Sequence, residues 1–132
     1  MLLPFKVMRV TGRSMVPALH PGELVVVHVR AYAARSPQRG DIVAARPAAY
    51  DGRAVMKRVA GLPHDYVEQG GRQWRLGEGE YFLLGDAQEE STDSRAFGPV
   101  TAEELIGPVT WCVWPLRRSA TWCRRNPAGQ AR

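Results

Sequence analysis

Glycine and proline turn signals separate short β-branched runs along most of this chain, and this pattern is the strongest constraint on its fold. Pro21 and Gly22 precede the run at 24–29, and Gly40 precedes the run at 42–45. Runs of this length bounded by turn residues are typical of strands. With 13 Gly and 10 Pro among 132 residues, the sequence predicts coiled antiparallel sheets in a mainly β fold. Further strands are expected at residues 55–59, 66–68, 73–76, 81–84 and 106–114, the second and third of these forming a hairpin.

Helices are expected to be few and short. Residues 14–19 are long enough for one helical turn, and residues 101–105 have the pattern of a short helix with Thr101 as its N-cap. Residues 31–39 are predicted to form a mobile loop. Pro108 lies within the last predicted strand and indicates an edge or a bulge there, because proline cannot donate to a sheet ladder. One or two short helices therefore complete the predicted fold.

Charge divides the chain into a balanced body and a basic end. Residues 1–116 hold equal numbers of basic and acidic side chains, whereas residues 117–132 carry five arginines and no acid, which gives the net charge of +5. We predict a single domain at 1–116 and a flexible tail at 117–132. The tail could contact acidic lipid at a membrane surface, and no nucleic-acid partner is expected for the neutral body.

No segment approaches the ~18 consecutive apolar residues of a membrane helix, and no secretory signal is evident at the start. We therefore expect a soluble, cytoplasmic chain, or a membrane-associated one if an anchor was removed. Cys112 and Cys123 do not have a metal-site spacing, and the three histidines have no His or Cys at ligand spacing. No metal or other cofactor is expected. A Ser-His-Asp triad stays open, because its members can be remote in sequence.

Four motifs occur in order over roughly residues 8–110, most of the chain. They are GRSMVPAL at 12–19, RGDIV at 39–43, MKRVAGLPHD at 56–65, and GD at 85–86 followed by STDSRAFGPV at 91–100. Together they resemble the type I signal peptidase family, whose members are serine proteases with a Ser/Lys dyad. The resemblance implies a coiled β fold of the signal peptidase and repressor-peptidase type. It also implies that Ser14 is the nucleophile and Lys57 the general base.

The chemistry of the two side chains agrees with these roles. A serine hydroxyl is a weak nucleophile until a neighbouring base takes its proton. Lysine is charged at neutral pH, with an ordinary pKa near 10.4, unless burial lowers that pKa. Lys57 lies in an apolar strand and is one of only two lysines in a chain with 18 basic residues. Arginine could not replace it, because arginine does not deprotonate in proteins.

The resemblance assigns supporting roles to further residues. Ser91 stands where the family has a serine that hydrogen-bonds the lysine, and Asp93 and Arg95 match an ion pair that braces the same loop. The backbone N–H of Ser14 is expected to contribute to the oxyanion hole. The expected substrate is a peptide or preprotein, bound in extended form by addition to a sheet edge and cleaved after small residues such as alanine. The residues expected to line its pockets are Met8, Val10, Met15, Val55 and Met56.

Three positions depart from the family pattern. Gly12 stands where many members have a serine that assists the oxyanion. His64 replaces a glycine in the motif after Lys57, and Ala87 with Gln88 replaces the usual Asn-Arg after Gly85 and Asp86.

Three other interpretations remain. The compact start of the chain resembles the soluble peptidases that trim the leader of nickel-type superoxide dismutase. A self-cleaving repressor-type peptidase shares the dyad, although only thirteen residues precede Ser14. A catalytically idle β-domain that binds extended peptides or a membrane surface is the non-enzymatic alternative.

Overall fold

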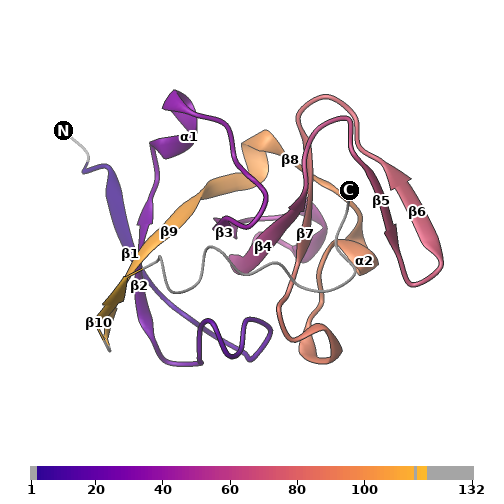
Figure 1. Ribbon diagram of the computed structural model, residues 1–132. Helices are drawn as coiled ribbons and strands as arrows, with labels where there is room; N and C mark the ends of the chain where they lie inside the picture. The colour runs from indigo at the N-terminus through magenta and orange to yellow at the C-terminus, as the bar shows by residue number, and fades with distance from the viewer. Residues whose placement is uncertain (1–2, 115, 119–132) are drawn as a thin grey trace.

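The computed structural model describes residues 3–114 and 116–118, and most of its regular secondary structure is strand (Figure 1). The strands are β1 (Phe5–Arg9), β2 (Leu24–His28), β3 (Ile42–Ala45), β4 (Val55–Gly61), β5 (Tyr66–Gln69), β6 (Arg72–Arg75), β7 (Glu80–Leu84), β8 (Val100–Thr101), β9 (Leu105–Trp114) and β10 (Leu116–Arg118). The helices are α1 (Ala31–Ala34) and α2 (Ser94–Phe97), with 3-10 turns η1 (Ala48–Tyr50), η2 (Gln88–Glu90) and η3 (Ala102–Glu104). The predicted mainly β fold with two short helices is confirmed.

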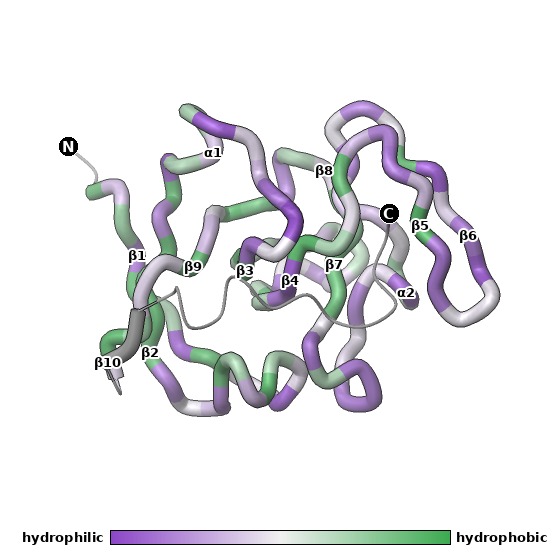
Figure 2. Tube along the Cα trace, in the orientation of Figure 1, coloured by the Kyte–Doolittle hydropathy of each residue, from purple (hydrophilic) through white to green (hydrophobic). Residues whose placement is uncertain are grey.

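One curled antiparallel sheet organises the molecule, in the order β1-β2-β9-β3-β4-β7-β8, with β10 added to β9. The β5–β6 hairpin forms a separate ribbon beside it and is largely hydrophilic (Figures 1 and 2). The start of β9 pairs with β3, and its later part pairs with β2. This long strand therefore joins the two halves of the sheet.

The position of Pro108 corrects part of a prediction. β9 lies between β2 and β3 in the sheet order, so it is not an edge strand of the described sheet. The predicted irregularity is present, because the register of β9 shifts on both sides of the proline. Gly107 is required next to it, since a Cβ there would collide with the backbone carbonyl of His28.

Apolar side chains from the inner faces of the strands form three clusters. The largest lies between β2, β9 and the loop after β1 and includes Val25, Val27 and Leu19, all fully buried. A second joins β3, β4 and β7, and a third packs the β5–β6 ribbon against β4 and β7 through Val67 and Phe82. Complete burial of a side chain of this size contributes roughly 1.5–3 kcal/mol to folding.

The structure also tests the predictions for three short segments, at residues 14–19, 31–39 and 101–105. Residues 14–19 form the predicted single turn, closed by the hydrogen bond from the Leu19 N–H to the Met15 carbonyl, but no helix, because Pro17 lacks an N–H and restricts the residue before it. The segment at 31–39, predicted as a loop, contains α1. The short helix after Thr101 is present as η3 and carries the predicted capping box.

The predicted basic tail begins inside a strand, because residues 117 and 118 belong to β10. Residues 119–132, including Cys123, lie outside the described residues, so the flexible tail and its contact with lipid stay predictions. No helix in residues 3–114 and 116–118 combines the length and apolar character needed to cross a bilayer.

Candidate active site

Ser14 lies in a loop between β1 and β2 that is anchored at both ends. The β1–β2 ladder continues beyond the strands, since Val10 N–H donates to the Glu23 carbonyl at 2.8 Å. Within the loop, Met15 and Leu19 are buried in the largest core cluster, and the Leu19 N–H donates to the Met15 carbonyl at 2.9 Å. These contacts hold Ser14 at the surface of the core, half-buried and open to solvent on one side.

The segment that follows β7 fixes Ser14 from a second direction. The Ala87 N–H donates to the Ser14 carbonyl at 2.8 Å. Gly85 packs so closely that an added Cβ would lie 2.6 Å from Ser91 Cβ and 2.8 Å from the Ser14 carbonyl oxygen. A side chain at residue 85 would therefore displace either the backbone of Ser14 or Ser91.

Lys57 reaches Ser14 from the middle of β4. Its Nζ donates to Ser14 Oγ at 2.8 Å across 43 residues of sequence. The side chain is only 5% exposed, and this burial lowers the pKa of the amine below its ordinary value. The nearby charges act less strongly and in opposite directions, because Asp93 raises this pKa and Arg95 lowers it. The geometry thus holds a serine hydroxyl against an amine that is biased toward its neutral form.

Ser91, Asp93 and Arg95 form one hydrogen-bonded network beside the pair. Arg95 Nε donates to Asp93 Oδ1 at 2.8 Å and its Nη2 to Oδ2 at 3.0 Å. Burial alone would raise the pKa of Asp93, but hydrogen bonds from Arg95, the Gly85 N–H and Ser91 together hold that pKa below its usual range. The ion pair predicted between Asp93 and Arg95 is therefore present and partly buried.

The hydrogen-bond partner of Ser91 differs from the expected one, Lys57. Its hydroxyl donates to Asp93 Oδ2 at 2.8 Å, and no hydrogen bond joins it to Lys57 among the described residues. The reason is local: Asp93 is two residues away and carries a buried carboxylate that accepts strongly. Ser91 is linked to Ser14 through packing against Gly85, which also lies close to the Ser14 carbonyl.

A cleft of about 260 Å³ opens in front of Ser14 and Lys57. All five residues predicted to contact substrate line it, namely Met8, Val10, Met15, Val55 and Met56. Val10, Met15 and Met56 also belong to the core, so the floor of the cleft is rigid and apolar. Among the residues described, no histidine lines the cleft, and no group of three or more His, Cys, Asp or Glu side chains could hold a metal ion.

Two strand edges face this cleft. β1 is the first strand in the sheet order, so its outer edge has no neighbouring strand in the described sheet. The pairing of β4 with β7 begins at Arg58, which leaves residues 55–57 paired with β3 alone. Free N–H and C=O groups on both walls suit an extended peptide that adds to a sheet edge.

Gly12 and Ser14 form the expected anion-binding side of the site. Gly12 has φ +75°, a conformation that favours glycine, and open space surrounds its Cα. The Ser14 N–H makes no hydrogen bond within the described residues, which leaves it available to an oxyanion. A serine at residue 12 would need a strained backbone here.

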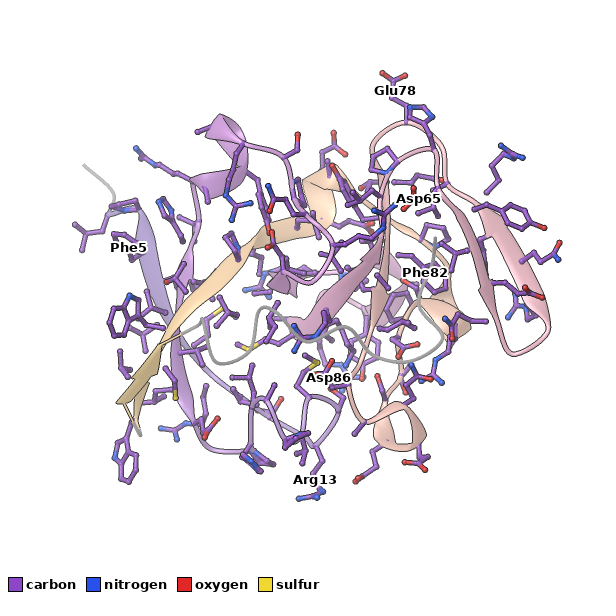
Figure 3. The ribbon with its side chains drawn as sticks, in the orientation of Figure 1. Phe5, Arg13, Asp65, Glu78, Phe82 and Asp86 are labelled. Atoms are coloured by element: carbon purple, nitrogen blue, oxygen red, sulfur yellow. The ribbon has the colours of Figure 1, made fainter. Side chains whose placement is uncertain are left out.

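Sequence reasoning missed a buried ion pair behind the site. Arg58, adjacent to Lys57, points to the opposite face of β4 and is fully buried. It donates from Nε and Nη2 to the two carboxylate oxygens of Asp86, both at 2.8 Å, and from Nη1 to the Gly40 carbonyl. Figure 3 shows Asp86 inside the molecule and Arg13 pointing outward from the Ser14 loop. An arginine within an apolar strand, together with the Gly-Asp motif, was the available signal.

The cleft also contains side chains that the sequence did not single out. They are Arg9, Arg13, Tyr50, Arg53, Glu90 and Thr92. They come from three separate segments, at 9–13, 50–53 and 90–92, so only the folded arrangement reveals that they share a surface.

Comparisons with known proteins agree with the architecture and the motifs. A family model described as "Signal peptidase, peptidase S26" matches residues 1–76 and 68–114. The chain is 35% identical over 130 residues to mitochondrial inner membrane protease subunit 2 of Danio rerio, covering 92% of this chain and 69% of that protein. It is 33% identical over 115 residues to mitochondrial ATP-independent inner membrane protease subunit 1b of Arabidopsis thaliana, covering 80% and 68%.

A solved structure of a signal peptidase I from Enterococcus faecalis V583 is 29% identical, with a TM-score of 0.49, covering 56% of this chain and 97% of that one. The family match and the two inner membrane protease relatives extend over most of this sequence. The chain therefore belongs to the signal peptidase family of proteases, peptidase S26.

Proposed function

We propose that this protein is a serine endopeptidase that cleaves a leader or signal peptide after small residues, with Ser14 as nucleophile and Lys57 as general base. The observation that carries the proposal is the 2.8 Å contact between Lys57 Nζ and Ser14 Oγ around a buried amine. Desolvation favours the neutral amine, and only the neutral amine has a lone pair that can take the serine proton.

The steps follow from the positions of these groups. Neutral Lys57 accepts the Ser14 proton as Oγ attacks the scissile carbonyl, and the Ser14 N–H donates to the developing oxyanion. The lysine ammonium then protonates the leaving amine, which leaves an acyl-enzyme on Ser14. A water molecule gives its proton to Lys57 and attacks the ester, which releases the acid product and restores the hydroxyl. Each proton that enters Lys57 leaves it within the same half of the cycle.

The cleft supports selection for small side chains before the cut. An extended segment lying between the edges of β1 and residues 55–57 directs alternate side chains toward Val10 and Met56, which are buried and give little room. Asp93 and Arg95 brace the loop beside Lys57 and act on the reaction through that position. Trimming of a nickel-type superoxide dismutase leader stays a narrower prediction, which a neighbouring dismutase gene would support.

The test uses a peptide with Ala-x-Ala before the cut. Ser14→Ala, Lys57→Ala and Lys57→Arg are each expected to abolish cleavage, and the double variant is expected to be no worse than either single one. Lys6→Ala is the matched control, because Lys6 is the other lysine of the chain, is exposed and lies outside the cleft lining. Wild-type turnover in a folded Lys57→Ala variant would exclude the dyad. Binding of the peptide without cleavage by the unaltered protein would favour the idle β-domain.

A further inference from the structure

The cleft has a positive rim that the proposed chemistry does not use. Arg9, Arg13 and Arg53 line it, against a single carboxylate, that of Glu90. Arg13 and Glu90 are already joined, with Nε 3.1 Å from Oε1 and both side chains about half exposed. Arg9 and Arg53 have no acidic partner among the described residues. Two exposed guanidinium groups are therefore free to meet a negative charge that enters the cleft.

Arg53 is held in place for such a contact. Its Cζ lies 4.6 Å from the centroid of the Tyr50 ring, and that ring packs against Phe97 with centroids 6.2 Å apart. Stacking of the guanidinium plane on an aromatic face leaves its N–H edge available, and a carboxylate can accept two hydrogen bonds from that edge. Less side-chain entropy is lost on binding than for an unsupported arginine.

Arg9 adds positive charge from the opposite wall of the cleft. It follows Met8 on β1, and its Nη1 donates to the Gly22 carbonyl at 3.0 Å. This contact fixes the side chain near the base of the Ser14 loop and leaves its other N–H groups free. Charge from both walls therefore acts on the segment of substrate between them.

The spacing between Arg53, two residues before β4 begins, and Lys57 within β4 gives the position of the contact. Arg53 precedes Lys57 by about four residues, which is roughly 13 Å at about 3.3 Å per extended residue. A substrate in the same extended form covers this distance in about four residues. The walls at residues 8–10 and 53–56 carry the segment before the cut under the proposed function.

We propose, on the basis of that function, that the cleft selects substrates with an aspartate or glutamate four residues before the cleaved bond, directly before the Ala-x-Ala segment, bound by Arg53 stacked on Tyr50. Arg9 adds attraction from the facing strand. The expected preference for aspartate over asparagine at that position is about fivefold in kcat/KM, which corresponds to about 1 kcal/mol for an exposed ion pair. It declines at high salt, because exposed charges are screened over ~10 Å at 0.1 M.

The experiment compares paired peptides with Ala-x-Ala before the cut that differ only by Asp, Asn or Lys at the fourth residue before the cleaved bond. Arg53→Gln is expected to bring the Asp-to-Asn ratio to about one, and Arg53→Glu to favour the Lys peptide over the Asp peptide. Arg75→Gln is the matched control, since Arg75 also stacks on a tyrosine, with Cζ 5.8 Å from the Tyr66 ring, but lies outside the cleft lining. It is expected to keep the full preference.

A second measurement separates this inference from the proposed function. Fluorescence anisotropy of the same peptides on the Ser14→Ala variant reports the charge preference without cleavage. Equal rates and equal affinities for the Asp and Asn peptides at low salt overturn the inference while leaving the dyad intact. A ratio that survives in Arg53→Gln also overturns it. If the unaltered protein cleaves none of these peptides, the proposed function is refuted. The ratio of the affinities for the Asp and Asn peptides, measured by anisotropy, then still decides whether Arg53 recognises acidic peptides.

Discussion

The substitution Gly85→Ala tests whether packing after β7 sets the position of the nucleophile. The added methyl would lie 2.6 Å from Ser91 Cβ and 2.8 Å from the Ser14 carbonyl oxygen, and closer still to Ser91 Oγ. Ordinary contact between such atoms begins at about 3.4 Å or more, so the neighbours must retreat by roughly 0.5–1 Å. The yielding atoms belong to Ser91 and to the backbone of Ser14 itself. The variant is therefore expected to move the Ser14 hydroxyl without removing either member of the proposed dyad.

The expected losses are of different size in stability and in rate. Overpacking of a buried site reduces the free energy of unfolding by about 1–3 kcal/mol. A displacement of about 1 Å at reacting atoms can lower kcat/KM by about a hundredfold. Urea denaturation and peptide cleavage of the same purified variant give the two quantities.

Gly61→Ala is the matched control for this design. A Cβ at residue 61 would meet Val67, Leu76 and Phe82 at 2.8–3.0 Å, all of them side chains of the cluster under the β5–β6 ribbon. It is expected to lose comparable stability and to keep kcat/KM at temperatures where it is folded. Wild-type kcat/KM in Gly85→Ala, or an equal loss of rate in Gly61→Ala, would refute the argument that this contact positions Ser14.

Three further predictions concern the groups around the pair. Burial lowers the pKa of Lys57, so kcat/KM is expected to rise with pH through a single apparent pKa below about 10.4. The control is His64→Ala, because an unchanged pH–rate profile in this variant excludes His64 as the group that causes the rise. Ser91→Ala is expected to reduce kcat/KM by roughly tenfold to a hundredfold, because its hydroxyl acts through Asp93 and Gly85. This reduction is smaller than the one expected for removal of the Lys57 amine. A complete loss of activity would instead place Ser91 in direct contact with the reacting atoms. Asp86→Ala leaves the fully buried Arg58 without this carboxylate and is expected to reduce the free energy of unfolding by about 3–5 kcal/mol in urea denaturation. A change under about 1 kcal/mol would show that the pair does not hold β4 to the segment that follows β7.

Local patterns predicted most of the strands, because each short apolar run is bounded by its own turn residues. The run that follows Gly40 becomes β3, and the one around Lys57 becomes β4. The two pairing partners of β9 could not be predicted from such local patterns. Its pairing with both β2 and β3 depends on bulges on either side of Pro108, and these are set by strands far away in the sequence.

The pair of Ser14 and Lys57 was predictable because the motifs around both residues have a fixed order along the chain. The hydrogen-bond partner of Ser91 was not predictable, since both the Lys57 amine and the Asp93 carboxylate could bond its hydroxyl. Only the conformation of the folded loop shows that the partner is Asp93. The sequence predicted that substrate adds to a sheet edge, but it could not show how far the edge of β4 is open, because that depends on where the β4–β7 register begins, at Arg58. Arg53 gave no sequence signal at all; its significance comes from Tyr50 and from the cleft that both line.

The burial of Lys57 couples folding to protons. The amine has a lower pKa in the folded protein than in the unfolded chain, so between these two values folding releases a proton. The free energy of unfolding contributed by this residue therefore rises with pH across that interval and is smallest on its acid side. Val43 and Val59, both fully buried beside it on β3 and β4, supply apolar contacts that offset the loss. The burial that would favour the neutral amine under the proposed function thus makes the sheet less stable at this residue, and the surrounding core has to compensate for that cost.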